Sequence, residues 1–388
     1  MTVPVDSLNF DTIALLTLVV VLSLVLYRFR SRLQTHSFLK IFYFCMVRTK
    51  LGMSAMERWA RRFEMPLKKL GWLMIPVGFL GMLVMIEELV RGAITVLQNT
   101  DALSVGVVLP IQAKGVFYVP FLYWIIAIAF IMVVHEFGHG IVARAFKVRV
   151  KSTGFAFLGA LIPIIPGAFV EIDEKHLAKQ SKYTQLSIFA AGPFVNIVFG
   201  ILFWLLLLGI QPASEGMFAS DGMRVLQIAE NSPAAISGLA VGDVLTAVND
   251  VQVHSVETFD SAFRGKLGGN TVSIATAAGA HTAVLAEGGR LGVQVEEARH
   301  LKDSVVQNHG SLLPSLFVWL AELVFWLFML NLGVGLFNLV PLGPIDGGRM
   351  FHTALERVVH HRHARTVWHA TSFVMLAIIV GTLISAFV

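Results

Sequence analysis

Cysteine is almost absent from this chain, and charged residues are scarce. The single cysteine, Cys45, can form no internal disulfide, and one thiol is too few for a cysteine-based metal site. Only 14% of the 388 residues are charged, about half the content of a soluble domain, while 56% are hydrophobic. These deficits exclude an ordinary soluble enzyme and indicate an integral membrane protein in a lipid bilayer.

The surplus of positive charge does not indicate a nucleic-acid partner. The net charge is +5 at pH 7, but the basic residues cluster beside apolar stretches, as they do in the cytoplasmic loops of membrane proteins. We therefore expect three basic regions on the cytoplasmic side, at residues 28–70, 144–183 and 349–366.

Six apolar stretches predict membrane-spanning helices, because each approaches or exceeds the length that crosses a bilayer. They cover residues 12–27, 71–90, 120–143, 184–210, 313–337 and 367–388. No positive charge precedes the first stretch and several arginines follow it, which is the reverse of a signal peptide. This order predicts an uncleaved anchor with its N-terminus outside.

Three segments between these stretches are less regular. Residues 28–69 mix basic residues with aromatic ones, which favours amphipathic helices on the inner membrane surface or a helical hairpin packed on other protein. Residues 92–119 are expected to form a loop. Residues 154–170 are apolar but broken by glycine and proline, which predicts a short strand pair dipping into the membrane.

Residues 212–311 differ from the rest in being acidic and rich in glycine and serine. Ser232-Pro-Ala-Ala, followed by Gly238-Leu and Gly242-Asp, predicts a strand, a short helix, a tight turn and a second strand. This pattern resembles a PDZ domain, a module that binds extended peptides at a sheet edge. The domain is expected outside the membrane, either binding peptide or acting as a spacer that blocks bulky substrates.

The predicted fold is therefore a membrane all-α protein with about six transmembrane helices, a membrane-dipping β-hairpin and one inserted α+β PDZ-like domain. Its expected parts are an N-terminal membrane region, the first half of a catalytic membrane core, the extracytoplasmic domain and the second half of the core. They cover residues 1–115, 116–211, 212–311 and 312–388.

The pattern most typical of catalysis is His135-Glu136-Phe137-Gly138-His139, near the end of the third apolar stretch. On a helix, His135 and His139 share one face and can reach one metal ion. Glu136 lies beside that face, where it can act as a general base toward water. Ionisable residues at membrane depth are functional candidates because burying them is costly.

A third ligand must come from another element. Asp346 follows a stretch broken by Pro341 and Pro344, and the charge pattern places it on the same side as the two histidines. Two histidines, one carboxylate and water form a catalytic zinc set. Asn196, in the fourth apolar stretch, is a buried polar residue that either holds two helices together or lines the active cavity.

Together these blocks resemble the site-2 protease family of intramembrane zinc metalloproteases. The resemblance rests on His135–His139, on Gly192-Pro193 with Asn196, on the PDZ-like insert and on the segment from Asn338 to Asp346-Gly347. It implies that His135, His139 and Asp346 bind one zinc ion, that Glu136 is the catalytic base and that Asn338 holds the substrate or oxyanion. The absence of a cysteine-rich insert of the animal type favours a prokaryotic cell membrane.

The expected function is hydrolysis of peptide bonds in or near the transmembrane segments of membrane-protein substrates, in regulated intramembrane proteolysis. The alternative is a zinc-binding membrane transporter, or a proteolytically inactive membrane adaptor that uses the PDZ-like domain. A transporter needs ligands along a path through the bilayer, and neither alternative needs Glu136.

Overall fold

The computed structural model describes residues 5–28, 33–38, 42–98, 107–110, 116–160 and 162–387. The chain divides into two compact units. The helical unit consists of Asp6–Leu206 and Leu323–Val388, and the inserted unit consists mainly of Leu207–Glu322. The inserted unit therefore interrupts the sequence of the helical unit.

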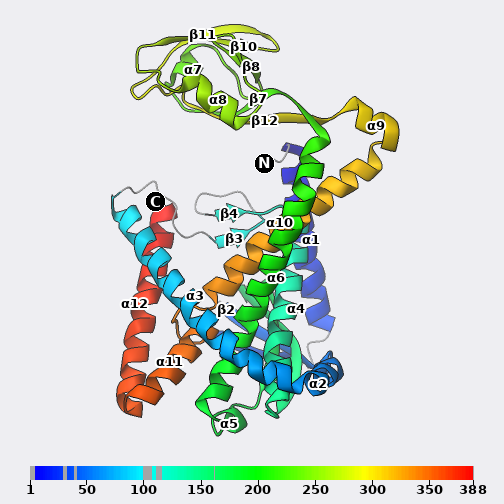
Figure 1. The fold of residues 1–388 in the computed structure, drawn as a ribbon, viewed down its shortest axis with the longest axis vertical. Coiled ribbons are helices and arrows are strands. Elements are labelled where there is room, and N and C mark those ends of the chain that lie inside the picture. Colours follow the sequence, from blue (N-terminus) through cyan, green and yellow to red (C-terminus); the bar gives the residue numbers. More distant parts are fainter. Residues whose placement is uncertain are drawn as a thin grey trace. The chain divides into compact units, whose positions relative to one another are not determined.

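Five helices among the described residues are long and apolar enough to cross a membrane, with mean hydropathies of 2.0 to 2.4 in their most apolar windows. The shortest of these stretches has 25 residues. At 1.5 Å per residue such a helix is about 37 Å long, more than the hydrocarbon core of a bilayer. The helices (Figure 1) are α3 (Glu64–Gln98), α4 (Phe121–Ala145), α6 (Lys182–Gly216), α10 (Leu312–Phe337) and α12 (His361–Phe387).

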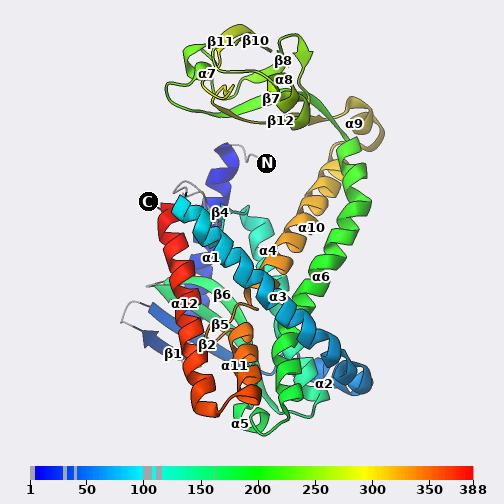
Figure 2. The same ribbon diagram turned by 60° about the vertical axis from the view of Figure 1, so that its left-hand side comes forward.

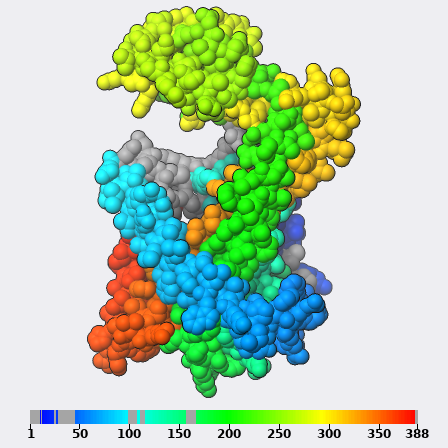
Figure 3. Space-filling view, viewed as in Figure 1, coloured from blue at the N-terminus to red at the C-terminus, as the bar shows by residue number. Residues whose placement is uncertain are grey.

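The outward-facing side chains of these helices are apolar. In α3, Trp72 is 75% exposed and Leu83 is 64% exposed, and in α6 Leu205 is 52% exposed. The space-filling view in Figure 3 shows α3 in blue and α6 in green along one face of the molecule. Because extended apolar surface of this kind marks membrane or protein contact, these faces are suited to lipid.

The predicted first span, residues 12–27, lies within α1 (Val5–Arg28). The apolar stretch of α1, Ile13–Leu24, is shorter than those of the other five helices. Among the described residues, five helices are therefore long and apolar enough to cross a membrane. The sixth span, expected at residues 12–27, stays a prediction.

A four-stranded antiparallel sheet belongs to the helical unit, with strand order β1-β2-β5-β6 (Figure 2). Its strands are β1 (Leu33–Phe38), β2 (Phe42–Thr49), β5 (Val150–Ala160) and β6 (Ile162–Ile172). The strand pair predicted at residues 154–170 is confirmed as β5 and β6, and it is longer than predicted. The glycine and proline residues that argued against a spanning helix are therefore part of a hairpin.

The prediction of amphipathic helices across residues 28–69 is wrong for residues 33–38 and 42–49, which form β1 and β2. The aromatic and branched residues of β2 have high strand propensity, and β2 pairs with β5 from Phe42 opposite Ala160 to Thr49 opposite Thr153. This partner lies more than a hundred residues away, so no local pattern announces it. Among the described residues of this segment that follow α1, helix begins at Met53, in α2 (Met53–Arg62) and at the start of α3.

Two predicted loops also contain regular structure. The expected loop at 349–366 is mostly helical, because α11 (Asp346–Val358) and the start of α12 occupy it. Met350 is fully buried and Arg357 is exposed, so α11 packs one face on the protein. In the expected loop at 92–119, α3 continues to Gln98, and a short parallel pair joins β3 (Val107–Leu109) to β4 (Val116–Tyr118).

The inserted unit has a sheet in the order β11-β10-β8-β7-β12, with β9 paired to β8. The predicted succession is present: Ser232 caps the short helix α7, Gly238 and Gly242 adopt φ values of +79° and +99°, and a strand follows. The elements are β7 (Phe218–Ile228), α7 (Pro233–Ile236), β8 (Val244–Val248), β9 (Val251–Gln252), α8 (Val256–Phe263), β10 (Thr271–Thr276), β11 (Gly279–Val284), β12 (Val293–Leu301) and α9 (Asp303–His309).

The main core of the helical unit holds α3, α4, α6 and α11 together. Ile188 of α6, Leu339 after α10 and Met350 of α11 are fully buried in one cluster. Small residues permit the close contacts: a Cβ added to Gly138 of α4 would lie 3.0 Å from the carbonyl oxygen of Ala191. This close approach of α4 to α6 brings the two helices together at the H-E-x-x-H segment.

Candidate metal centre

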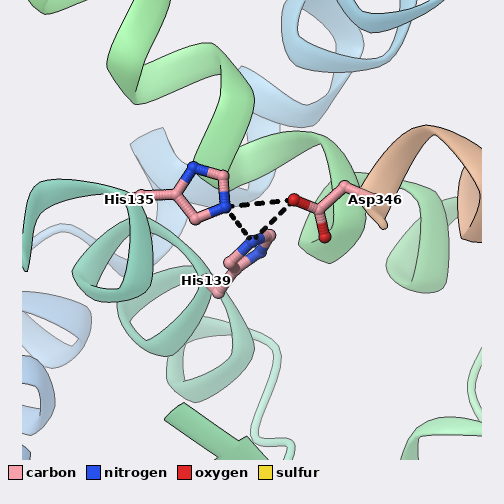
Figure 4. A group of neighbouring side chains, drawn as sticks. All are labelled: His135, His139 and Asp346. Carbon is pink, nitrogen blue, oxygen red and sulfur yellow. Dashed lines mark hydrogen bonds and ion pairs between the residues drawn. The ribbon is translucent and has the colours of Figure 1, made fainter. Parts of the chain in front are cut away.

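The two histidines of the H-E-x-x-H segment meet on one face of α4. They are one helical turn apart, and their Nε2 atoms are 3.2 Å from each other. Asp346 approaches from α11, with its Oδ2 atom 3.1 Å from His135 Nε2 and 3.2 Å from His139 Nε2 (Figure 4). These three side chains form the one group of potential metal ligands found among the described residues.

Asp346 reaches this position because the chain turns sharply between α10 and α11. The N–H of Gly347 donates to the carbonyl oxygen of Asn338 at 2.7 Å, which folds the turn back on itself. A Cβ on Gly347 would lie 2.2 Å from the backbone of Leu339, so only glycine fits there. Asp346 is thereby fixed as the first residue of α11, although 207 residues separate it from His139.

The charge of Asp346 suits a ligand role. Burial by itself would raise the pKa of its carboxyl group, but the neighbouring His139 and His135 outweigh burial and hold that pKa below its usual range. An ionised carboxylate beside two imidazoles offers one oxygen and two nitrogens, the donor set of a catalytic zinc site.

Both histidines are oriented by a partner on α6. His139 donates its Nδ1–H to the carbonyl oxygen of Ile188 at 2.7 Å, which leaves Nε2 with its lone pair free. The amide nitrogen of Asn196 lies 3.1 Å from Nδ1 of His135. Asn196 is fully buried, and its Oδ1 accepts no hydrogen bond from the described residues. If the side-chain amide of Asn196 were rotated by a half-turn, its Oδ1 would accept a hydrogen bond from a protonated Nδ1 of His135. The lone pair on Nε2 of His135 would then be available to a metal ion, as it is in His139.

A glycine lets both imidazoles lie close against α6. A Cβ on Gly192 of α6 would lie only 2.3 Å from His139 Nε2 and 2.7 Å from His135 Nε2. A larger residue at this position would displace the two rings, so Gly192 keeps their Nε2 atoms together. The donor set and the oriented imidazoles fit zinc.

Glu136 lies on the same cavity but not in the ligand group. Its Oε2 accepts a hydrogen bond of 2.7 Å from the backbone N–H of Val170 on β6. The cavity has a volume of about 290 Å³ and is also lined by the three ligand residues and by Asn338.

Two charged residues also line this cavity. Arg349 of α11 pairs with Glu174 of the short helix α5 (Glu174–Leu177) at 2.5 Å, and its guanidinium lies 4.3 Å from the ring centre of Phe189. Both ends of the pair are partly exposed, so the contact lies toward solvent.

The structure thus brings four of the predicted site residues and Asn338 to one cavity, while Asn196 lies behind His135. Sequence reasoning named Gly192 only as part of the family resemblance and missed its contact with the two histidines. It also missed Ile188 and Val170, which act through backbone atoms. Backbone contacts carry no residue-type signal, so the sequence offered no way to find the last two.

A comparison with known families agrees with this geometry. The model of peptidase family M50 matches residues 123–382, more than half of the chain. The chain belongs to peptidase family M50. This is the site-2 protease family, so the resemblance seen in the sequence is confirmed.

Several relatives of this M50 peptidase have known sequences. An uncharacterised protein of Methanocaldococcus jannaschii is 25% identical over 360 residues, which cover 90% of this chain and 87% of that protein. The regulator of sigma-E protease RseP of Escherichia coli is 30% identical over 186 residues, or 40% of this chain and 38% of RseP. The zinc metalloprotease RasP of Oceanobacillus iheyensis is 25% identical over 219 residues, or 43% of this chain and 50% of RasP. The chain therefore spans half or less of the two named proteases.

The M50 peptidase is a zinc-dependent metalloendopeptidase and a multi-pass membrane protein. His135, His139 and Asp346 form the group that can bind its one metal ion.

Proposed function

We propose that this M50 peptidase hydrolyses peptide bonds in or near the transmembrane segments of membrane-protein substrates. The observation that carries the proposal is the position of the site: the ligand histidines and Glu136 belong to α4, a helix apolar and long enough to lie in the bilayer. A substrate segment in the same bilayer can reach such a site without leaving the membrane.

In this proposal His135, His139 and Asp346 hold zinc, and Glu136 is the general base. A bound zinc ion supplies Lewis-acid polarisation of the peptide carbonyl and lowers the pKa of a water. Glu136 takes the proton of the attacking water through Oε1 or Oε2 and passes it to the nitrogen of the leaving amine. Its position beside the ligand face, on the shared cavity, supports this role.

The two asparagines have different proposed roles. Asn338 lines the cavity, so its side-chain amide can donate to the scissile carbonyl as negative charge develops on the oxygen. Asn196 contacts Nδ1 of His135 and does not line that cavity. We assign it a positioning role: it fixes the ring of His135, as outer partners of metal-binding histidines do.

The outer edge of β6, where the N–H of Val170 is already bonded to Glu136, supports a way of holding the substrate. β6 is an edge strand of the described sheet, and the N–H of Val170 points away from β5, since it donates to Glu136. An extended peptide added along this edge would pass directly beside Glu136. Because a helical substrate buries its carbonyl groups in backbone hydrogen bonds, it must first unwind, and pairing with β6 would replace the bonds that it loses.

The inserted unit is proposed to be a PDZ-like domain on the extracytoplasmic face, where it binds peptide or the ectodomain of a substrate. The acidic composition of residues 212–311, set between basic segments, supports this side. The metal centre would then lie toward the cytoplasm of a prokaryotic cell, since basic residues follow directly after α4.

The test is Glu136→Gln in the purified full-length protein, with a tagged single-span membrane protein as substrate. Proteolysis should be abolished while zinc remains at about one ion per chain, because Glu136 is not in the ligand group. Glu287→Gln, on an exposed residue of the inserted unit, is the matched control and should cleave normally. Substantial cleavage by Glu136→Gln would exclude this residue as the base.

A further inference from the structure

A second cavity adjoins the metal centre at Glu136. It has a volume of about 200 Å³ and shares Glu136, Phe169 and Val170 with the cavity of the metal centre. None of the three metal-ligand residues lines it. A substrate chain lying against Glu136 would therefore border two cavities. One contains the metal-ligand residues, and the other is an additional recess.

The walls of this recess come from three parts of the chain. Val133 and Phe137 of α4 form one wall, and Phe155 of β5 contributes to a second. The third is the turn between β2 and α2 with the first residues of α2, where Leu51 and Met56 line the recess. The turn lies close to α4 because a glycine, Gly52, occupies its positive-φ position: a Cβ there would be 2.7 Å from the ring of Phe137.

The lining is apolar because its hydroxyl groups are already engaged. Thr153 Oγ1 donates to the carbonyl oxygen of Leu51 at 2.7 Å, and Thr49 Oγ1 donates to the carbonyl oxygen of Thr153 at 3.3 Å. Among the residues that line the recess, Glu136 is the one with a charge, and Val170 occupies its Oε2. Such a recess favours an apolar guest and disfavours an additional charge.

The volume suits one large side chain. An apolar cavity of about 150 Å³ is enough to bind benzene, so a recess of about 200 Å³ admits a leucine or phenylalanine side chain. It is too small for a helix, which is about 10 Å across. Its occupant must therefore be a single residue of an unwound chain.

We propose that this recess binds the side chain of the substrate residue immediately C-terminal to the scissile bond, and that it selects an apolar residue there. The inference rests on the proposed function of Glu136. The nitrogen that Glu136 must protonate belongs to that residue, so the residue has to lie within hydrogen-bond reach of Glu136. Its side chain then enters the cavity that opens beside Glu136.

A segment without any recognisable motif would then have a role. Leu51 in the turn before α2 and Met56 in α2 lie outside residues 123–382, the part that matches the M50 family model. The selectivity of this peptidase would then depend on its own N-terminal region, packed against the shared catalytic core.

The test changes the size of the recess in the full-length, zinc-loaded protein. Phe155→Ala enlarges it and Leu51→Trp narrows it; these residues are 46% and 66% exposed, so neither change should prevent folding. The substrates differ only in carrying alanine, leucine or tryptophan after the scissile bond, and mass spectrometry identifies the cleaved bond. Phe373→Ala, on an exposed residue of α12, is the matched control.

The unchanged enzyme should prefer leucine over alanine and tryptophan. Phe155→Ala should raise the kcat/KM ratio of tryptophan to leucine about tenfold, and Leu51→Trp should raise the ratio of alanine to leucine by a similar factor. The same replacements at the residue before the scissile bond should leave both ratios unchanged.

The proposal is overturned if both variants bind one zinc ion and cleave, yet keep the kcat/KM ratios of the unchanged enzyme. It is also overturned if the preference changes only at the residue before the scissile bond. Either result would leave the role of Glu136 intact, whereas cleavage by Glu136→Gln would remove the basis of both proposals.

Discussion

Replacing Gly192 with alanine should empty the metal centre while leaving the helix intact. The added methyl carbon would lie 2.3 Å from Nε2 of His139 and 2.7 Å from Nε2 of His135. Real Cβ contacts are essentially never below 3.0 Å, so bringing the shorter distance from 2.3 Å to 3.0 Å requires a shift of 0.7 Å.

This shift is large compared with what a metal site tolerates. Ligand distances in metal sites vary by only about 0.2 Å, so imidazoles displaced by 0.7 Å would no longer meet the ion at binding distance. We expect zinc binding to weaken at least ~100-fold, which corresponds to about 2.8 kcal/mol. The helix itself should not suffer, because alanine is about 0.8–1 kcal/mol more favourable than glycine inside a helix.

The assay is zinc content per chain after dialysis against a graded zinc buffer, with cleavage of a tagged substrate measured in parallel. Gly209→Ala is the matched control, since Gly209 is on the same helix and a Cβ there would meet nothing within 4 Å. The control should keep full zinc and full activity. If Gly192→Ala also binds zinc with unchanged affinity and cleaves normally, the Nε2 atoms of His135 and His139 that lie against Gly192 do not bind the metal.

Three further changes test the rest of the site and the topology. Asp346→Ala should lower zinc affinity at least tenfold and remove activity, because two histidines alone are too few ligands. The control is Asp303→Ala, in the inserted unit, which should leave zinc content unchanged. If Asp346→Ala kept its full zinc content, α11 would be excluded from the site. Asn196→Ala should cost about 10–100-fold in zinc affinity or activity, whereas an unchanged value would show that His135 needs no partner at Nδ1. In a cysteine-free background, Ser255→Cys and Ser181→Cys should be labelled from opposite sides of the membrane, and labelling from one side would contradict the proposed topology.

Local patterns in the sequence were enough for the long helices and for one strand pair of this protein. The long apolar stretches predicted the helices α3, α4, α6, α10 and α12, because apolar length is read directly from the chain. The spacing of His135 and His139 placed both on one helical face, and the glycine and proline residues at 154–170 predicted the strand pair. Each of these features depends on residues that are close in sequence.

Tertiary structure decided which elements meet. Residues 33–38 and 42–49 were expected to be helical because their aromatic residues are compatible with either pattern, but pairing of β1 with β2 and of β2 with β5 makes them strands. Asp346 was expected near the histidines from charge patterning, but its distances of 3.1 and 3.2 Å depend on the packing of α11 against α4 and α6. The close approach of the histidines to Gly192 and the recess at Leu51 also arise only where distant segments touch. Such contacts are set by the shape and volume of whole packed surfaces, which no short stretch of sequence encodes.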